Sequence, residues 1–183
     1  MKKTATGIED LYVIEPTVHG DERGYFMESF SEKWFQEEVN DTRFVQDNES
    51  KSSRGVLRGL HFQNPPMEQA KLVRVVQGEV LDVAVDLRKN SPTYGKHFSV
   101  RLSAENKKQL FVPRGFAHGF SVLSETAVFS YKVDNFYSQE LEEGIRWDDP
   151  SLNIDWQLPT DAIQLSEKDK TQQDFSSYES KFV

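Results

Sequence analysis

The residues best suited to chemistry lie in one stretch, residues 54–63, with the sequence RGVLRGLHFQ. Apolar and polar residues alternate here, as in a strand that has one working face. His61 can carry a proton near neutral pH, and Arg58, three residues earlier, can hold an anion. An isolated glycine in a strand, such as Gly59, often marks a bulge or a close approach of two backbones. Taken alone, His61 is more often a hydrogen-bonded residue of a half-buried strand than a catalytic group.

A second set of acid–base groups occurs further along the chain. His118 lies between two phenylalanines, Tyr131 comes near the end of an apolar run, and Lys71 opens another. An imidazole, a phenol and an amine on the walls of one barrel could remove and return a proton next to a carbonyl group. Each also has an ordinary interpretation, because strand tyrosines pack their rings and strand-end lysines are solvated. Plain surface charges are an equally good interpretation of three carboxylates, Glu28, Asp82 and Asp86.

Several other chemistries lack sequence support. The four histidines, at positions 19, 61, 97 and 118, are not paired at i, i+2 or i, i+4, so we predict no metal site. Neither a glycine-rich phosphate loop nor a G-x-S-x-G motif occurs, and the chain has no cysteine for disulfides or thiolate chemistry. What remains is a set of acid–base groups without a metal, and a reaction that only moves protons needs no cofactor.

Charge and the N-terminal sequence limit the partners and the compartment. A formal net charge of −8 disfavours binding to nucleic acid or to an anionic membrane. The first ten residues contain two lysines but no apolar segment typical of a signal peptide, and no apolar run is long enough to cross a bilayer. The sequence thus predicts a cytoplasmic protein.

Short strand-like runs separated by turn residues dominate the chain. The pattern predicts one domain over residues 1–183, an antiparallel sandwich or barrel with one short helix at residues 32–39, preceded by Ser31 as N-cap. Residues 49–53 are predicted to be a polar loop, the segment after residue 138 to be irregular, and residues 171–183 to be a mobile tail. The predicted strands are 11–16, 25–30, 44–48, 71–76, 80–87, 98–102, 110–112, 119–123 and 127–133.

Motifs spread over residues 11–169 resemble the dTDP-4-dehydrorhamnose 3,5-epimerase family of nucleotide-sugar enzymes. The resemblance implies an all-β, cupin-type jelly roll without a metal ion. The motifs, which follow the order of the family, are DERGYFME (21–28), QDN (46–48), RGLHFQ (58–63), KLV (71–73), GEVLDVAVD (78–86), PRGFAHGF (113–120), YK (131–132), IRWDDP (145–150) and SEKD (166–169).

The resemblance also implies roles for individual residues. His61 is similar to the general base, oriented by Asp169 in a His–Asp dyad, and Tyr131 to the general acid on the opposite face of the sugar. Lys71 resembles the lysine near the C4 oxygen, and His118 a residue that contacts the substrate. The remaining matches bind the substrate's sugar, nucleotide or diphosphate, with Tyr137 stacking on the thymine: Arg23, Phe26, Glu28, Gln46, Asn48, Arg58, Tyr137, Glu142 and Lys168. Arginine is also usual at position 168, where lysine replaces a bidentate fork by a point charge.

One geometric question stays open at the level of sequence. Arg58 and His61 are three residues apart, which puts them on opposite faces of a regular strand. Either Gly59 allows a bulge, or Arg58 reaches around an edge or serves the site of a neighbouring subunit. The last alternative is of interest because the resemblance implies a homodimer that exchanges strands.

The reaction implied by the resemblance converts dTDP-4-dehydro-6-deoxy-D-glucose to dTDP-4-dehydro-L-rhamnose. The C4 ketone acidifies the C–H bonds at C3 and C5, so one base could serve both carbons, and inversion requires a separate acid on the other face. Three alternatives remain: a mono-epimerase acting on a related 4-keto nucleotide sugar, a 4-keto-sugar isomerase, and a non-catalytic sugar-binding cupin. The sequence does not decide between thymidine and another nucleoside.

Overall fold

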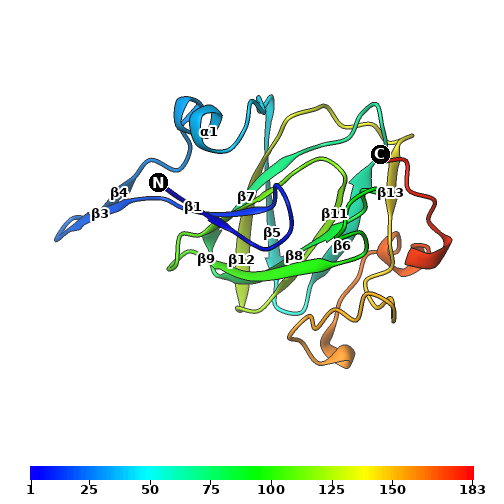
Figure 1. The fold of residues 1–183 in the computed structure, drawn as a ribbon. Coiled ribbons are helices and arrows are strands. Elements are labelled where there is room, and N and C mark those ends of the chain that lie inside the picture. The colour runs from blue at the N-terminus through cyan, green and yellow to red at the C-terminus, as the bar shows by residue number, and fades with distance from the viewer.

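Two antiparallel sheets packed face to face form the body of the protein in a computed structural model that describes residues 1–183 (Figure 1). The six-stranded sheet has the order β1 (Lys2–Ala5), β2 (Tyr12–Glu15), β10 (Gln109–Val112), β7 (Lys71–Gln77), β12 (Thr126–Val133), β5 (Gln46–Ser53). The five-stranded sheet has the order β13 (Glu142–Gly144), β6 (Leu57–Gln63), β11 (Phe116–Val122), β8 (Glu79–Asp86), β9 (His97–Ser103). The predicted all-β, cupin-type fold is confirmed.

The remaining regular elements lie outside this sandwich. Strands β3 (Val18–Asp21) and β4 (Gly24–Met27) form a hairpin that projects from the body (Figure 1). The only α-helix, α1 (Glu32–Glu38), begins after Ser31, whose hydroxyl accepts a hydrogen bond from the Trp34 amide as the sequence predicts for an N-cap. Three short 3₁₀ turns occur in the C-terminal segment, namely η1 (Thr160–Ala162), η2 (Asp169–Thr171) and η3 (Phe175–Ser177).

Strand β8 shows how the core is organised. Its even-numbered residues, such as Val80 and Ala84, point between the sheets into the largest apolar cluster. Its odd-numbered residues, such as Leu81 and Val83, belong to a second cluster that is covered by the C-terminal segment. Because both faces of β8 are covered, nearly the whole strand is buried.

Two predictions about polar segments are wrong. Residues 49–53, expected to be a loop, continue β5, because all eight residues of this edge strand pair with β12 from Gln46 to Ser53. The tail, expected to be mobile, packs against the body: Tyr178 and Phe182 are buried with their rings against Phe62, and the Tyr178 hydroxyl donates to Asn64 Oδ1 at 3.1 Å. A few apolar anchors in a polar sequence are enough to hold it.

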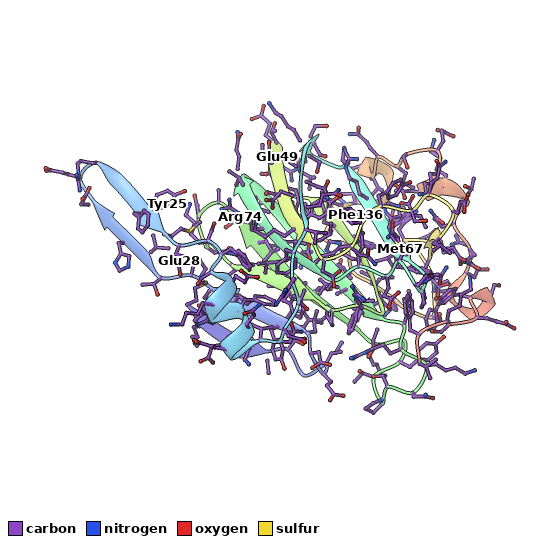
Figure 2. All side chains as sticks on the ribbon, turned by 90° about the horizontal axis from the view of Figure 1, so that it is seen from above. Tyr25, Glu28, Glu49, Met67, Arg74 and Phe136 are labelled. Atoms are coloured by element: carbon purple, nitrogen blue, oxygen red, sulfur yellow. The ribbon has the colours of Figure 1, made fainter.

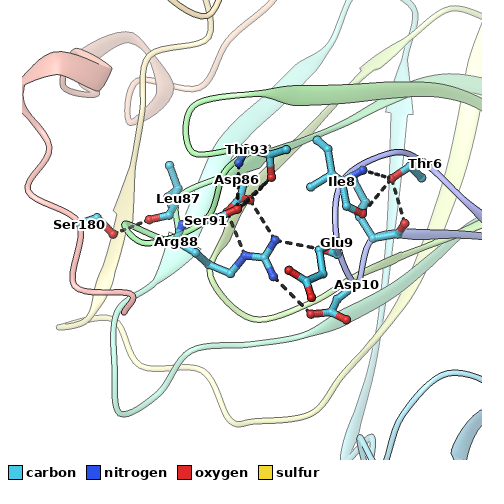
Figure 3. A network of polar contacts seen from close by, with 11 residues as sticks. Thr6, Ile8, Glu9, Asp10, Asp86, Leu87, Arg88, Ser91, Thr93 and Ser180 are labelled. Carbon is cyan, nitrogen blue, oxygen red and sulfur yellow. Dashed lines mark hydrogen bonds and ion pairs between the residues drawn. The ribbon is translucent and has the colours of Figure 1, made fainter.

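A buried ionic network closes the far end of β8 (Figure 3). Asp86 is fully buried and accepts hydrogen bonds from the Arg88 guanidinium at 2.9 and 3.0 Å, from Ser91 at 2.6 Å and from Thr93 at 2.7 Å. The same guanidinium donates to the carbonyl of Glu9 at 3.1 Å, in the loop between β1 and β2. The network thus ties the N-terminal loop to the end of β8.

No helix in the structure has the length and apolar character needed to cross a membrane.

Candidate active site

A cavity of ≈ 450 Å³ opens between the two sheets. Its lining combines an apolar wall, which includes Phe120 and Phe129, with a set of ionisable side chains. Six of the residues singled out from the sequence lie on this lining, and they come from five different elements: Arg58, His61, Lys71, His118, Tyr131 and Asp169.

A bulge at Gly59 brings Arg58 and His61 to the same cavity. In the pairing of β6 with β11, His61 lies opposite His118 and Arg58 opposite Phe120, so three steps on β6 match two steps on β11. The extra residue reverses the alternation of faces between the two functional side chains. Gly59 has φ +125°, and a Cβ added there would lie 2.5 Å from the Cα of Gly119, so only glycine fits. Of the open explanations, the bulge is therefore the one that this chain uses.

His61 is paired with a buried carboxylate. Its Nε2 is hydrogen-bonded to Asp169 Oδ1, and Asp169 is 3% exposed. The Ser166 hydroxyl donates to the other carboxylate oxygen at 2.8 Å. Burial raises the pKa of Asp169, but the hydrogen bonds from His61 and Ser166 outweigh it and hold the pKa below its usual value. An ionised Asp169 accepts the Nε2–H of His61, which leaves Nδ1 as the nitrogen that can take up a proton.

Lys71 and Tyr131 supply the donors of the cavity. Burial lowers the pKa of Lys71 to about 8, although the negative charges of Asp82 and Glu142 counteract part of this effect. The ammonium form therefore still predominates at neutral pH. Burial raises the pKa of the Tyr131 phenol, against the opposing charge of Arg58, so that this residue stays protonated. Both groups are thus prepared to donate a proton or a hydrogen bond.

A second His–Asp pair lies beside the first. His118 Nε2 is 2.9 and 3.0 Å from the two carboxylate oxygens of Asp82, and both residues are buried. The interpretation of Asp82 and Asp86 as surface charges is wrong, since both are 0% exposed. A usable signal was present: both acids lie in the run of residues 80–87, which is otherwise apolar on both faces, and this indicates that the acids are buried too.

The predicted nucleotide-binding residues of the body surround this cavity. Gln46 and Asn48 share the inward face of β5 with Ser50, which lines the cavity, and the Gln46 amide donates to Asn48 at 2.9 Å. Glu142 accepts from the Tyr137 hydroxyl at 2.7 Å and pairs with Lys168 at 2.5 Å. Its charge acts on Lys71, Tyr131 and His61, so this cluster lies next to the catalytic candidates.

Three predicted site residues lie away from the cavity of their own chain. Arg23 is exposed near the hairpin tip and pairs with Asp21 at 2.5 Å, and the Phe26 residue is 71% exposed. Glu28 follows the hairpin at its base (Figure 2). None of the three lines the cavity.

The described side chains include no group of three or more histidines, aspartates or glutamates placed to hold a metal ion.

Fold and site together define an acid–base site in a cupin-type β-sandwich: a His–Asp dyad, a protonated phenol and a buried ammonium share one cavity. A sequence model described as dTDP-4-dehydrorhamnose 3,5-epimerase matches residues 5–177, so the chain belongs to that family. A relative from Shigella flexneri named dTDP-4-dehydrorhamnose 3,5-epimerase is 58% identical over 176 residues, which cover 96% of each chain.

Solved structures agree with this assignment. A crystal structure of dTDP-4-dehydrorhamnose 3,5-epimerase from Elizabethkingia anophelis has 58% identity and a TM-score of 0.92, covering 96% of this chain and 97% of that one. A dTDP-6-deoxy-D-glucose-3,5-epimerase from Legionella pneumophila, solved in complex with dTDP-4-keto-L-rhamnose, has 49% identity and a TM-score of 0.93, covering 97% of this chain and 94% of that one.

Proposed function

We propose that this protein is a dTDP-4-dehydrorhamnose 3,5-epimerase, an isomerase that converts dTDP-4-dehydro-6-deoxy-D-glucose to dTDP-4-dehydro-L-rhamnose. The observation that carries the proposal is the convergence of His61, Tyr131 and Lys71 on one cavity. Proton removal and return beside a ketone need a base, a separate acid and a cation, and these three side chains match those roles.

The first step is proton abstraction by His61. The unprotonated Nδ1 takes the proton from C3 or C5, and the electrons of the broken C–H bond move onto the C4 oxygen to give an enolate. The imidazolium that forms is stabilised by Asp169, which is buried and held ionised by its hydrogen bonds. Ser166 fixes the orientation of that carboxylate.

Lys71 meets the charge that develops on the C4 oxygen. Its ammonium is already desolvated, so it requires little reorganisation when the enolate forms, and a buried donor is stronger than one in water. Removal of this charge would leave the enolate without its principal partner.

Tyr131 returns a proton from the opposite face. The raised pKa of the phenol keeps it protonated until the enolate is present, and donation of its proton to carbon inverts the configuration. The net change at each carbon is the replacement of one C–H bond by another, so the electrons balance without an oxidant or a reductant.

The surrounding cluster is proposed to hold the nucleotide. Arg58, whose guanidinium is anchored to Ser52 at 3.2–3.3 Å, and Lys168 can pair with the diphosphate. Tyr137 is exposed and offers a ring face on which the thymine can stack. Gln46 and Asn48 supply further hydrogen-bonding groups on β5.

We further propose a homodimer in which the β3–β4 hairpin of one copy reaches the cavity of the other. The hairpin projects from the body (Figure 1), and its exposed Arg23 and Phe26, which do not line the cavity of their own chain, support this arrangement. In a dimer, Phe26 would be buried and Arg23 could bind substrate phosphate. Cytoplasmic location stays a prediction from the sequence.

Incubation of enzyme and substrate in D₂O tests the proposed reaction. We expect two solvent deuterons in the product, one at C3 and one at C5, together with inversion at both carbons. One deuteron would identify a mono-epimerase, and a 3-keto product without inversion an isomerase. Binding of dTDP without any exchange would identify a sugar-binding protein and would contradict the assignment of an enzyme.

A further inference from the structure

Asp82 is a buried carboxylate of the cavity region that the mechanism above does not use. It lies on β8 between the sheets, is 0% exposed, and receives hydrogen bonds only from His118 Nε2. A carboxylate in such surroundings is unfavourable unless positive charge compensates it. The compensating groups available here are the ammonium of Lys71 and, when protonated, the imidazole of His118.

Asp86, four residues further along the same face of the same strand, has a different environment. Three side chains donate to it and an arginine neutralises it, so its hydrogen bonds serve the fold. Asp82 has a single partner that is itself part of the cavity lining. A buried carboxylate with so few hydrogen-bond donors contributes little to the stability of the fold. Its position beside the cavity therefore points to a role in the chemistry.

The position of the pair supports that role. His118 lies directly opposite His61 in the register of β11 and β6, and the ring is stacked on Phe129 with centroids 6.2 Å apart. Asp82 fixes this ring by its Nε2 edge, while its negative charge acts on Lys71. His118 and Lys71 therefore both interact with one carboxylate, that of Asp82, which itself does not line the cavity.

We propose that Asp82 is a positioning residue: it holds His118 in place and supplies the buried negative charge beside the Lys71 ammonium, so that both side chains are presented to the oxygen of the enolate. This inference rests on the proposed function, because it assigns a task within the same reaction. Loss of Asp82 should impair turnover much more than nucleotide binding, since the nucleotide-binding candidates belong to other elements.

Other titratable or charged groups also surround Lys71 and His118, and they are unchanged by a substitution at Asp82. They come from β6, β12, β13 and η2 and comprise Arg58, His61, Tyr131, Glu142 and Asp169. A shift that follows substitution of Asp82 alone can therefore be assigned to that carboxylate.

The test compares Asp82→Asn with Asp86→Asn, the same substitution at two fully buried positions of one strand. For Asp82→Asn we expect kcat to fall about tenfold to a hundredfold, less than the roughly 10²–10³ lost with a direct donor. The affinity for dTDP, used as the probe of nucleotide binding, should change less than about threefold. The alkaline limb of the kcat profile should move to lower pH, because Lys71 loses its proton more easily without the neighbouring charge.

Asp86→Asn should lower the melting temperature while leaving kcat and its pH profile unchanged at 25 °C. If Asp82→Asn keeps the wild-type kcat and alkaline limb, the inference is overturned while the proposed function stands. If the wild-type protein itself does not epimerise the substrate, the proposed function has failed. Asp82→Ser provides a second variant with a small hydrogen-bonding side chain, and if neither variant at position 82 folds although Asp86→Asn does, Asp82 is a structural residue and the inference is wrong.

Discussion

Strand β8 holds two buried acids in opposite circumstances. At its C-terminal end, Asp86 is surrounded by donors from Arg88, Ser91 and Thr93, which together satisfy the carboxylate, and Arg88 also donates to the Glu9 carbonyl. In the middle of the strand, Asp82 has only His118, which lines the cavity. Burial alone therefore does not identify a functional acid, whereas the partners of the buried charge do.

Asp169 resembles Asp82, because its partners include a histidine of the cavity lining. It receives hydrogen bonds from His61 and Ser166 and lies on a short 3₁₀ turn outside the sheets. An ionised acid that holds a histidine at a cavity wall can stabilise the imidazolium that forms during a reaction, while an acid bound by a guanidinium is already neutralised.

The largest effect is expected at the base. His61→Asn should lower kcat by about 10²- to 10⁴-fold, the share usually due to general base catalysis, with little change in melting temperature. Steady-state kinetics and thermal unfolding measure both quantities. His97→Asn, at a histidine on β9 that does not line the cavity, serves as the matched control and should keep full activity. A loss of less than tenfold for His61→Asn would remove His61 from its role.

Lys71→Gln should lower kcat by about 10²- to 10³-fold, because it removes the cation that meets the enolate. In the wild-type enzyme the active form is the ammonium, so kcat should decline as the pH rises through about 8, the value to which burial lowers the pKa of Lys71. A pH–rate profile measures this limb. Lys132→Gln, which removes a lysine bound to Asp47 outside the cavity, should retain the limb. A flat wild-type profile between pH 7 and roughly 9.5 would argue against Lys71 as the cation.

At the C-terminal end of β8, Asp86→Asn should lower the free energy of unfolding by about 3 kcal/mol, because the substitution leaves Arg88 partly unpaired. Burial raises the pKa of Asp86, but the hydrogen bonds from Arg88, Ser91 and Thr93 bring it below its ordinary value of 3.8. The carboxylate therefore stabilises the fold fully above about pH 4, and this contribution is lost as the pH falls through the lowered pKa. Urea unfolding at several pH values should show the difference between wild type and variant shrinking in acid. A difference independent of pH would place the stabilisation elsewhere.

Much of the site could be predicted from the sequence because its residues lie within recognisable motifs. The strand that carries His61, the runs around His118 and Tyr131, and the N-cap at Ser31 all follow from local patterns. The bulge at Gly59 could only be offered as one of several explanations, because the register that requires it is set by the neighbouring strand.

The features that sequence reasoning missed depend on contacts between distant segments. The polar half of β5 becomes a strand through its pairing with β12, and the tail is held by two aromatic residues that pack on Phe62. Asp82 seemed to be a surface charge because its face of β8 is covered by the opposite sheet, whose strands β7 and β12 come from other parts of the chain. Tertiary covering of this kind leaves only a weak local signal.

The central claim is that His61 removes the proton and Tyr131 returns one from the other face. It is tested most directly with Tyr131→Phe in D₂O, by NMR of the sugar recovered after incubation. The account predicts deuterium at C3 and C5 of unreacted substrate with retained configuration, because His61 can still exchange its proton with solvent and return a deuteron to the face it came from. Inverted product formed by Tyr131→Phe at close to the wild-type rate would contradict it.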